Sequence, residues 1–507
     1  MKRIKAHWFC LLAVALSACS GGGEGGIPND LKNVARNRTL ILDCIDPGTC
    51  AGQMKDYDTF NPYVPGQTSR TGYQFLYEPL YFYNAYGAED NIIPWIATGH
   101  EFNADYTEIT INIREGVEWS DGHPWTAHDL VFTINMLKAN VPLLLFSTDM
   151  NTWVKEAVAV DSLTARISLT APNPRFVFTY FTHNFDNGVP IVPKHIWDGQ
   201  DSEVFKNLDL AKGWPVVSGP YRLALSSPQQ RMWDLRDDWW ASKIGFKAAP
   251  KVERLIFLPY VDEAKRVQLM LANQLDSCGD SRPPNIRSMV EGNPKITSWT
   301  GRDGALGYLD WWPISLGFNN LEWPFSDPQV RRAINFAVNR DQLVEVGWQG
   351  SGTPAKVPFP AFPPIRRFTD GIQDLIEQSG VGVYDIEKSA GLMEAGGWQK
   401  NGAGMWEKDG KTVKMAINIF GGFQDIGAGA GGAIAARRFR GLVSPDLGRL
   451  RSDVAGRGAG LYHGARGFGA RPLFHDAALP QPFRAADGYG GGAFLALEEY
   501  GLRRAGR

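Results

Sequence analysis

The chain has few cysteines and little net charge. Its 507 residues include five cysteines, and the formal net charge at pH 7 is −2. An even mixture of charges of both signs argues against a nucleic-acid partner. The zinc-binding patterns CxxC and HExxH are absent, so the sequence indicates neither a dedicated metal site nor a cofactor. The length exceeds what one compact core holds, and about two or three domains are expected.

The amino terminus lacks a hydrophobic run long enough for a lasting transmembrane helix. Its basic residues Lys2, Arg3 and Lys5 precede only a short apolar run at 8–16, which is typical of a signal peptide. The run ends in Leu-Ser-Ala-Cys, which resembles a bacterial lipobox, with cleavage before Cys19 and lipid on that cysteine. The alternatives are an ordinary secretory peptide and a chance cysteine.

This pattern predicts a signal peptide at 1–18 and a lipidated, flexible tether at 19–35, since its run of glycines resists ordering. The mature protein is then expected on the periplasmic face of a membrane, in an oxidising compartment. There Cys44 and Cys50 either form a small-loop disulfide or remain thiols. Cys278 is left over and is expected to be a buried thiol.

Aromatic residues are abundant. The chain has 17 tryptophans, and 12% of its residues are aromatic. Such side chains either enlarge a core or line a cleft that grips apolar or flat ligands. Composition alone leaves both interpretations open.

Local periodicity predicts a mixed α/β fold. Alternating apolar residues indicate strands, and helical spacing behind capping residues such as Thr126 and Asp129 indicates helices. Asp-Ser and Asp-Gly pairs at 161–162 and 409–410 mark hairpin turns. We expect strands at 39–42, 108–114 and 252–259, hairpins at 158–169 and 405–420, and helices at 126–137, 262–275 and 385–396.

The segment 314–340 predicts a strand, a turn and an amphipathic helix. Apolar residues alternate over 314–318, and Pro328 suits the first turn of a helix because it has no amide hydrogen. Either Ser326 or Asp327 offers the side-chain oxygen that caps this helix.

The composition changes abruptly near the end of the chain. Residues 427–507 are mostly Gly, Ala and Arg and contain no Lys, Asn, Thr, Trp, Met or Cys. A flexible Gly/Arg tail fits this composition. A GC-rich gene read out of frame also yields it, and we favour that hypothesis.

Several short motifs follow one another in a set order. They lie at 58–63 (DTFNPY), 77–80 (YEPL), 113–116 (IREG), 119–131 (WSDGHPWTAHDLV), 218–221 (SGPY) and 318–340 (from FNN to VNR). This series resembles the family 5 extracellular solute-binding proteins of bacterial ABC transporters, the dipeptide and oligopeptide receptor group. Each motif is short, but their order over residues 38–425 is specific.

The resemblance implies an α/β, periplasmic-binding-protein-like two-lobed fold of type II, with an extra small domain. Lobe I combines 36–70 with 186–308, the extra small domain is 71–185, and lobe II is 309–426 and incomplete. The resemblance further implies a monomeric, lipid-anchored receptor, not an enzyme, which captures a peptide in the interlobe cleft by hinge closure and delivers it to an ABC permease.

Ligand contacts are expected from aromatic loops and from residues near the strands that cross between lobes. The candidates are Phe60, Asn61, Tyr63, Tyr77, Glu78, Trp311 and Trp312. For each of them, core packing is the alternative. His123 and His128 are expected at the surface or in the core rather than on a metal.

One departure from the family pattern concerns the ligand. Peptide receptors of this family hold the ligand's amino group with an acidic residue in the C-terminal part of lobe II, and 427–507 contains no recognisable match. An oligosaccharide receptor of the same fold is therefore the first alternative. A secreted hydrolase is a weaker alternative, since the sequence has no GxSxG pattern. A surface interaction protein is another, and it would differ by lacking a cleft that closes.

Overall fold

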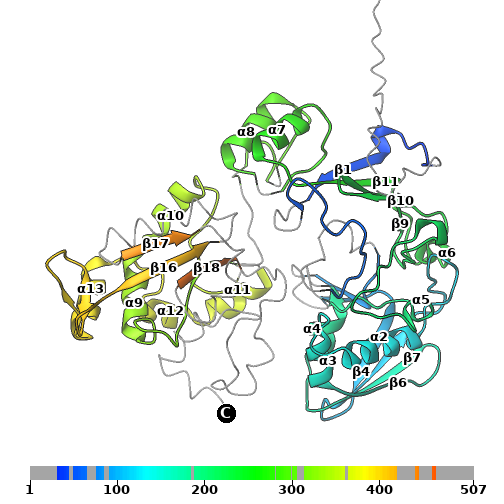
Figure 1. Ribbon diagram of the computed structural model, residues 1–507, viewed down its shortest axis with the longest axis horizontal. Coiled ribbons are helices and arrows are strands. Elements are labelled where there is room, and N and C mark those ends of the chain that lie inside the picture. Colours follow the sequence, from blue (N-terminus) through cyan, green and yellow to red (C-terminus); the bar gives the residue numbers. More distant parts are fainter. Residues whose placement is uncertain are drawn as a thin grey trace, which may run out of the picture.

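The computed structural model describes residues 31–44, 50–64, 76–84, 91–183, 188–279, 281–298, 300–304, 306, 313–359, 363–419, 440–444 and 459–463. Within these ranges the chain folds around two separate apolar cores. The elements around the first are drawn in blue to green and those around the second in yellow-green to orange-red (Figure 1). The buried residues of the first core lie between Cys44 and Phe257, and those of the second between Phe325 and Ile417. Each lobe of a two-lobed fold has to bury its own apolar surface, and the two cores do so.

The first core is built on a four-stranded sheet in the order β1–β11–β10–β9. β1 and β11 are parallel, with Ile41 opposite Ile256, and β10 is antiparallel to both of its neighbours. The carboxyl ends of β1 and β11 therefore meet at one edge of the sheet. The strands are β1 (Thr39–Asp43), β9 (Tyr221–Ser227), β10 (Gln230–Leu235) and β11 (Arg254–Leu258).

A second, antiparallel sheet shares this core, and α2 packs on it. Its order is β4–β5–β7–β6, and Ile109, Ile111 and Ile113 of β5 alternate into the interior as the sequence predicts. The predicted capping box starts α2, because the Thr126 N–H donates to Asp129 Oδ2 at 2.8 Å. The elements are β4 (Ala97–Phe102), β5 (Glu108–Ile113), β6 (Val154–Ala159), β7 (Thr164–Leu169), α2 (Ala127–Ala139) and α3 (Ser147–Trp153).

Short elements complete this half of the molecule. They are η1 (Arg36–Arg38), η3 (Leu210–Lys212), α4 (Phe176–Phe181), α5 (Lys194–Trp197), α6 (Trp240–Lys243), and the small sheet of β2 (Tyr81–Tyr83), β3 (Ile92–Pro94) and β8 (Thr182–His183).

Two helices follow β11 and pack on each other: α7 (Glu263–Leu271) and α8 (Pro283–Gly292). α7 is shorter than the helix expected at 262–275. Asn273 adopts a left-handed φ of 57°, a conformation that ends a helix and that asparagine tolerates. The prediction was too long because apolar residues at helical spacing continue to Leu275, whereas the helical backbone ends before Asn273.

The second core lies between a four-stranded sheet and several helices. The sheet has the order β12–β18–β16–β17. α9 and α13 pack together, and the Ser389 hydroxyl donates to the Ala333 carbonyl oxygen at 2.7 Å. The elements are β12 (Ile314–Phe318), β16 (Lys414–Ile419), β17 (Arg440–Ser444), β18 (Ala459–His463), α9 (Pro328–Ala337), α10 (Arg340–Gly347), α11 (Pro363–Asp370), α12 (Gln373–Ser379) and α13 (Ile386–Ala395).

The hairpin expected at 405–420 is only partly correct. β14 (Trp406–Lys408) and β15 (Lys411–Thr412) do pair around Asp409 and Gly410, whose φ values of 54° and 71° suit a tight hairpin turn. β13 (Gln399–Lys400) adds a third strand. After Val413, however, the chain leaves this small sheet, and β16 pairs with β17 and β18 instead.

Two strands, β17 and β18, come from the Gly-, Ala- and Arg-rich stretch 427–507. Both are parallel to β16, and β18 also pairs with β12. The rest of that stretch lies outside the described residues, and the frame-error hypothesis stays a prediction. In the part of the chain that the structure describes, no helix combines the length and the apolar character needed to cross a membrane.

Candidate ligand-binding face of lobe I

The carboxyl edge of the β1–β11 pair carries a pocket. In open sheets with parallel strands, ligands bind beyond the carboxyl ends of the strands. The pocket has a volume of about 250 Å³ and is lined by Asp43, Gly52, Gln229, Leu258, Pro259, Val261, Leu269 and Leu275. This is less than the roughly 300–1,000 Å³ of a complete small-molecule site, so the pocket suits one part of a larger ligand.

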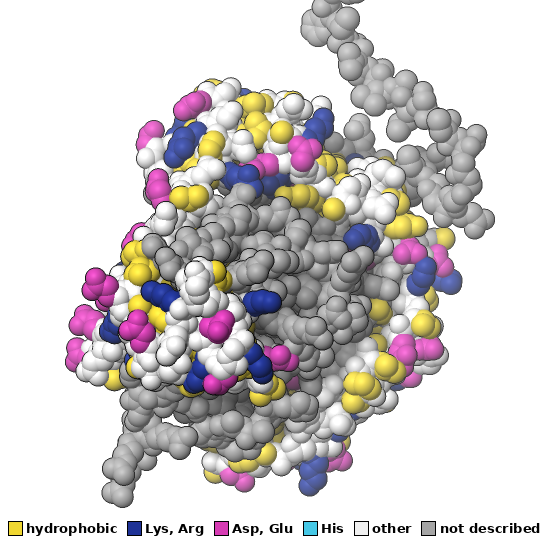
Figure 2. Space-filling model, turned by 60° about the vertical axis from the view of Figure 1, so that its left-hand side comes forward, with side chains coloured by type: hydrophobic (Ala, Val, Ile, Leu, Met, Phe, Trp, Pro, Cys, Tyr) yellow, Lys and Arg dark blue, Asp and Glu magenta, His cyan; other side chains and the backbone are white. Residues whose placement is uncertain are grey.

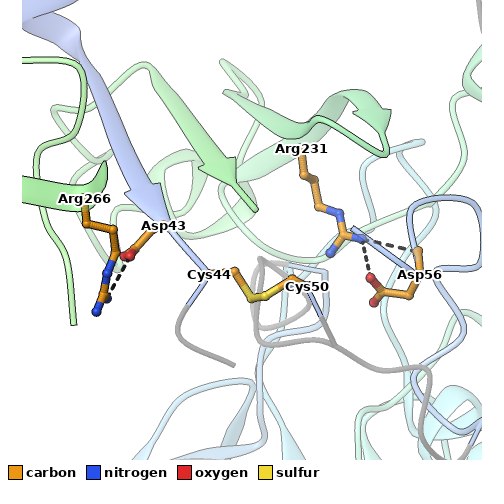
Figure 3. The surroundings of a disulfide bond; sticks show 6 residues. All are labelled: Asp43, Cys44, Cys50, Asp56, Arg231 and Arg266. Atoms are coloured by element: carbon orange, nitrogen blue, oxygen red, sulfur yellow. Dashed lines mark hydrogen bonds and ion pairs between the residues drawn. A yellow bond between two sulfur atoms is a disulfide. The ribbon is translucent and has the colours of Figure 1, made fainter. Parts of the chain in front are cut away.

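A disulfide braces the chain beside this pocket. Cys44 and Cys50 are bonded, which decides between the two alternatives that the sequence left open (Figure 3). The segment that Cys50 begins runs along the end of β11: the Tyr260 N–H donates to the Cys50 carbonyl oxygen at 2.9 Å, and the Gly52 N–H donates to that of Tyr260 at 3.0 Å. The two sides of the pocket are thus held to each other through the backbone.

Two buried ion pairs flank the disulfide (Figure 3). Arg266 Nη1 lies 3.1 Å from Asp43 Oδ2, and Arg231 Nη2 lies 3.1 Å from Asp56 Oδ1. Removing one member of such a pair leaves a buried charge and is strongly destabilising. Burial raises the pKa of Asp43, and the Arg266 guanidinium limits that rise.

Sequence reasoning did not single out these pairs. A buried arginine has the same local sequence signature as an exposed one, and Asp43 and Arg266 are 223 positions apart. The only local signal is that Asp43 directly follows the apolar residues of β1.

Of the predicted ligand contacts, Phe60, Asn61 and Tyr63 lie in the interior, each with 0% of its surface exposed. The Phe60 ring packs edge-on against Trp233 at 6.0 Å, and the Arg231 guanidinium carbon lies 4.7 Å from its centre. Asn61 Nδ2 donates to the Ser202 carbonyl oxygen at 2.9 Å. Phe60 also has a left-handed φ of 48°, which is unusual for an aromatic residue.

Tyr63 and Tyr77 belong to the same buried layer. The Tyr63 hydroxyl donates to the Pro190 carbonyl oxygen. Asn207 Nδ2 donates to the Tyr77 hydroxyl at 2.8 Å and to the Phe60 carbonyl oxygen at 3.4 Å. The side-chain amide of Asn207 therefore links Phe60 and Tyr77, two of the predicted ligand contacts.

Glu78 is a buried carboxylate that accepts from three indole N–H groups. Trp240, Trp95 and Trp239 donate to it at 2.6, 3.1 and 3.4 Å. Burial raises the pKa of Glu78 to about 7, although these hydrogen bonds oppose the rise. The hydrogen-bond donors to the Glu78 carboxylate among the described residues are therefore side chains of the protein.

The prediction that these five residues contact a ligand stays a prediction. Trp311, Trp312 and Cys19 lie outside the described residues. On the face drawn in Figure 2, basic and acidic side chains of the described residues are interspersed. Their charges therefore partly neutralise one another on that face.

Comparison with known proteins identifies the family. The model of the bacterial extracellular solute-binding proteins, family 5 Middle, matches residues 91–420, which include elements of both cores. The chain belongs to this family. The resemblance found in the sequence motifs is confirmed, and family 5 proteins are binding proteins of ABC transporters rather than enzymes.

Individual relatives agree with this assignment. This chain is 26% identical to the dipeptide-binding protein of Escherichia coli over 361 residues, which cover 67% of this chain and 62% of the relative. It therefore spans less than two thirds of that relative's length.

Solved structures show the same two-lobed fold. The periplasmic oligopeptide-binding protein of Thermotoga maritima matches with a TM-score of 0.69 and 23% identity, covering 84% of this chain and 76% of that one. A mannohexaose-bound structure of the same protein matches with a TM-score of 0.66 and 23% identity, covering 87% and 78%.

Proposed function

We propose that this protein is a lipid-anchored, monomeric receptor of an ABC importer that captures peptides between its two lobes and delivers them to a membrane permease. The observation that carries the proposal is the family 5 match across elements of both cores. The name of the E. coli relative, a dipeptide-binding protein, supports a peptide as the ligand. Closure of two lobes about a hinge is the usual mechanism of such receptors.

In this proposal, the pocket at the carboxyl edge of β1 and β11 forms the part of the cleft that lobe I contributes. Its apolar lining suits a side chain, and Asp43 and Gln229 offer polar atoms beside it. Trp311 and Trp312, at the start of lobe II, are the proposed ligand contacts from that lobe. Phe60, Asn61, Tyr63, Tyr77 and Glu78 remain the predicted ligand contacts of lobe I, with core packing as the alternative that their burial favours.

The proposed division of the chain follows the sequence in its first part: lobe I is 36–70 with 186–308, and the extra small domain is 71–185. Lobe II starts at 309, and its sheet extends beyond 426, because β17 pairs with β16 and β18 pairs with β12 and β16. Lipid on Cys19 would hold the receptor at the periplasmic face of the membrane, close to the permease.

An oligosaccharide is the second candidate ligand. It is favoured by the 17 tryptophans, which suit stacking on sugar rings, and by the mannohexaose-bound structure of the Thermotoga protein. The absence of a recognisable acidic residue for a peptide amino group also favours it.

A thermal-shift screen separates the two candidates. Di- to pentapeptides and cello- and manno-oligosaccharides are added to the purified chain, and the melting temperature is compared with that of the free protein. A ligand at a hundredfold its dissociation constant stabilises the folded state by about 2.7 kcal/mol, an easily detected shift. We expect peptides to produce it.

Variants then locate the site. Trp311→Ala and Trp312→Ala should weaken binding of the identified peptide, while Trp323→Ala, which changes a tryptophan that is 45% exposed, should not. A shift with oligosaccharides alone rejects the peptide proposal. Equal affinity in all three variants rejects the assigned site but not the function.

A further inference from the structure

Three side chains that can bind a metal converge on the surface of the first half of the molecule. Asp121 Oδ2 lies 2.6 Å from His195 Nε2 and 3.2 Å from His123 Nδ1. The two imidazole rings stack with their centres 4.1 Å apart. All three donor atoms lie within 4.8 Å of one another, and His128, the histidine that the sequence paired with His123, is not among them.

The backbone holds this cluster in place from both sides. On one side, the His123 N–H donates to Asp121 Oδ1 at 3.2 Å, and the Ser120 N–H donates to the Val217 carbonyl oxygen at 2.8 Å. The turn that carries Asp121 and His123 is thus fixed within itself and to the neighbouring chain.

On the other side, the helix that carries His195 is tied to the first turn of α2, which follows the turn with Asp121 and His123. The Lys194 N–H donates to Asp129 Oδ1 at 2.8 Å, and Asp129 Oδ2 accepts from the Thr126 N–H in the capping box. One carboxylate therefore fixes both the start of α2, directly after the turn, and the start of α5. The backbone segments that carry the three donors are therefore held close to one another without an ion.

The donor set and its spacing fit a first-row transition metal. Two imidazole nitrogens and one carboxylate oxygen form a known three-ligand set for zinc, with water in the fourth position. Bonds of about 2.0–2.1 Å in a tetrahedron separate two ligand atoms by roughly 3.3 Å. The measured oxygen-to-nitrogen separations are 2.6 and 3.2 Å, and the imidazole rings stack at 21°, so one ring has to turn out of the stack for both nitrogen lone pairs to point at one ion.

We propose that Asp121, His123 and His195 bind a Zn²⁺ ion. His195 is 74 positions from Asp121, so the ion would cross-link the turn before α2 to α5. In the proposed division of the chain, this bond joins the extra small domain to lobe I. The site is separate from the pocket at the carboxyl edge of β1 and β11, and it does not depend on the identity of the transported ligand.

Isothermal titration of ZnCl₂ into the full chain, purified without a histidine tag and treated with a chelator, tests this. We expect saturable binding by the wild type. His195→Ala and Asp121→Asn should each bind one zinc fewer per chain or bind it with an affinity lower by about tenfold or more. Zinc should also raise the melting temperature of the wild type but not of these variants. X-ray absorption of the loaded protein should show imidazole ligands.

His128→Ala is the matched control, because His128 is also exposed and lies five positions from His123. It should bind zinc as the wild type does. The proposal is overturned if the wild type shows no saturable binding, if both site variants bind as tightly as the wild type, or if His128→Ala weakens binding as much as they do. Circular dichroism without zinc verifies that each variant is folded.

Discussion

Glu78 is a buried carboxyl group that joins three tryptophans of the first core. It is 6% exposed, and its carboxylate is satisfied by indoles that come from three different positions of the chain. A charge buried in this way is costly unless its donors are kept. The residue is therefore sensitive both to substitution and to pH.

The stability of the protein should depend on pH through Glu78. Burial raises the pKa of its carboxyl from 4.5 to about 7, so the folded state binds the proton more tightly than the unfolded state. The contribution of Glu78 to the free energy of unfolding is therefore largest below pH 4.5. As the pH rises from 4.5 to 7, linkage lowers this contribution by about 3 kcal/mol. Glu78→Gln should remove this contribution and make the slope shallower, because glutamine does not titrate, while buried carboxyls such as Asp43 and Asp129, whose pKa values are also raised, still titrate.

Urea unfolding followed by tryptophan fluorescence at pH 4.5, 6 and 7.5 measures the effect. Glutamine replaces one acceptor oxygen by a donor, which adds a cost that does not vary with pH, so the slope is the informative quantity. Glu203→Gln, at an exposed position, should keep the wild-type slope. If Glu78→Gln also keeps it, the account of Glu78 is wrong.

Which residues the sequence could reveal depends on how local their partners are. The Cys44 and Cys50 pair was recognised as a candidate disulfide from its short spacing. The Asp43–Arg266 pair was not, because nothing near either residue marks the other as its partner. The same holds for His195, which meets His123 only after the chain has folded.

At the scale of elements, helix starts were the most predictable features. N-capping uses a side chain and an amide two or three positions on, so the signal is entirely local. Asp385 accepts from the Lys388 N–H at 2.8 Å, and the capping box of α2 is formed as expected. The end of α7 and the path after Val413 were missed because both depend on backbone conformation and on strand partners far away.

Asp327 should be the residue that caps α9. The sequence left Ser326 and Asp327 as alternatives, and in the structure Asp327 Oδ1 accepts from the Gln329 N–H at 2.8 Å. Asp327→Ala should therefore destabilise lobe II by about 1 kcal/mol. Ser326→Ala should change stability by much less, and thermal or urea unfolding of both variants compares them directly. A larger loss in Ser326→Ala would contradict the assignment.

At the scale of the whole molecule, the two apolar cores explain why the chain forms two lobes. The main question is whether the stretch 427–507 is native sequence. The order of the short motifs was sufficient to identify the family, because several short motifs in one fixed order are far more specific than any one of them. The shape of the ligand site was not predictable, since it needs strands from opposite ends of the sequence to meet.

The frame-error hypothesis predicts a specific outcome for 427–507. Resequencing the gene and translating the shifted frame should reveal renewed strand and helix periodicity after about residue 426. That sequence should include an acidic residue suited to a peptide's amino group. If the shifted frames show no such patterning, the Gly-, Ala- and Arg-rich stretch is the native end of the chain.

Native mass spectrometry tests the central claim, peptide capture by a two-lobed receptor, most directly. The purified chain is sprayed with a mixture of di- to pentapeptides and manno-oligosaccharides at equal concentrations. We predict a one-to-one complex whose added mass is that of a peptide. A complex with oligosaccharide alone, or no complex with any peptide at concentrations that saturate a micromolar site, would contradict it.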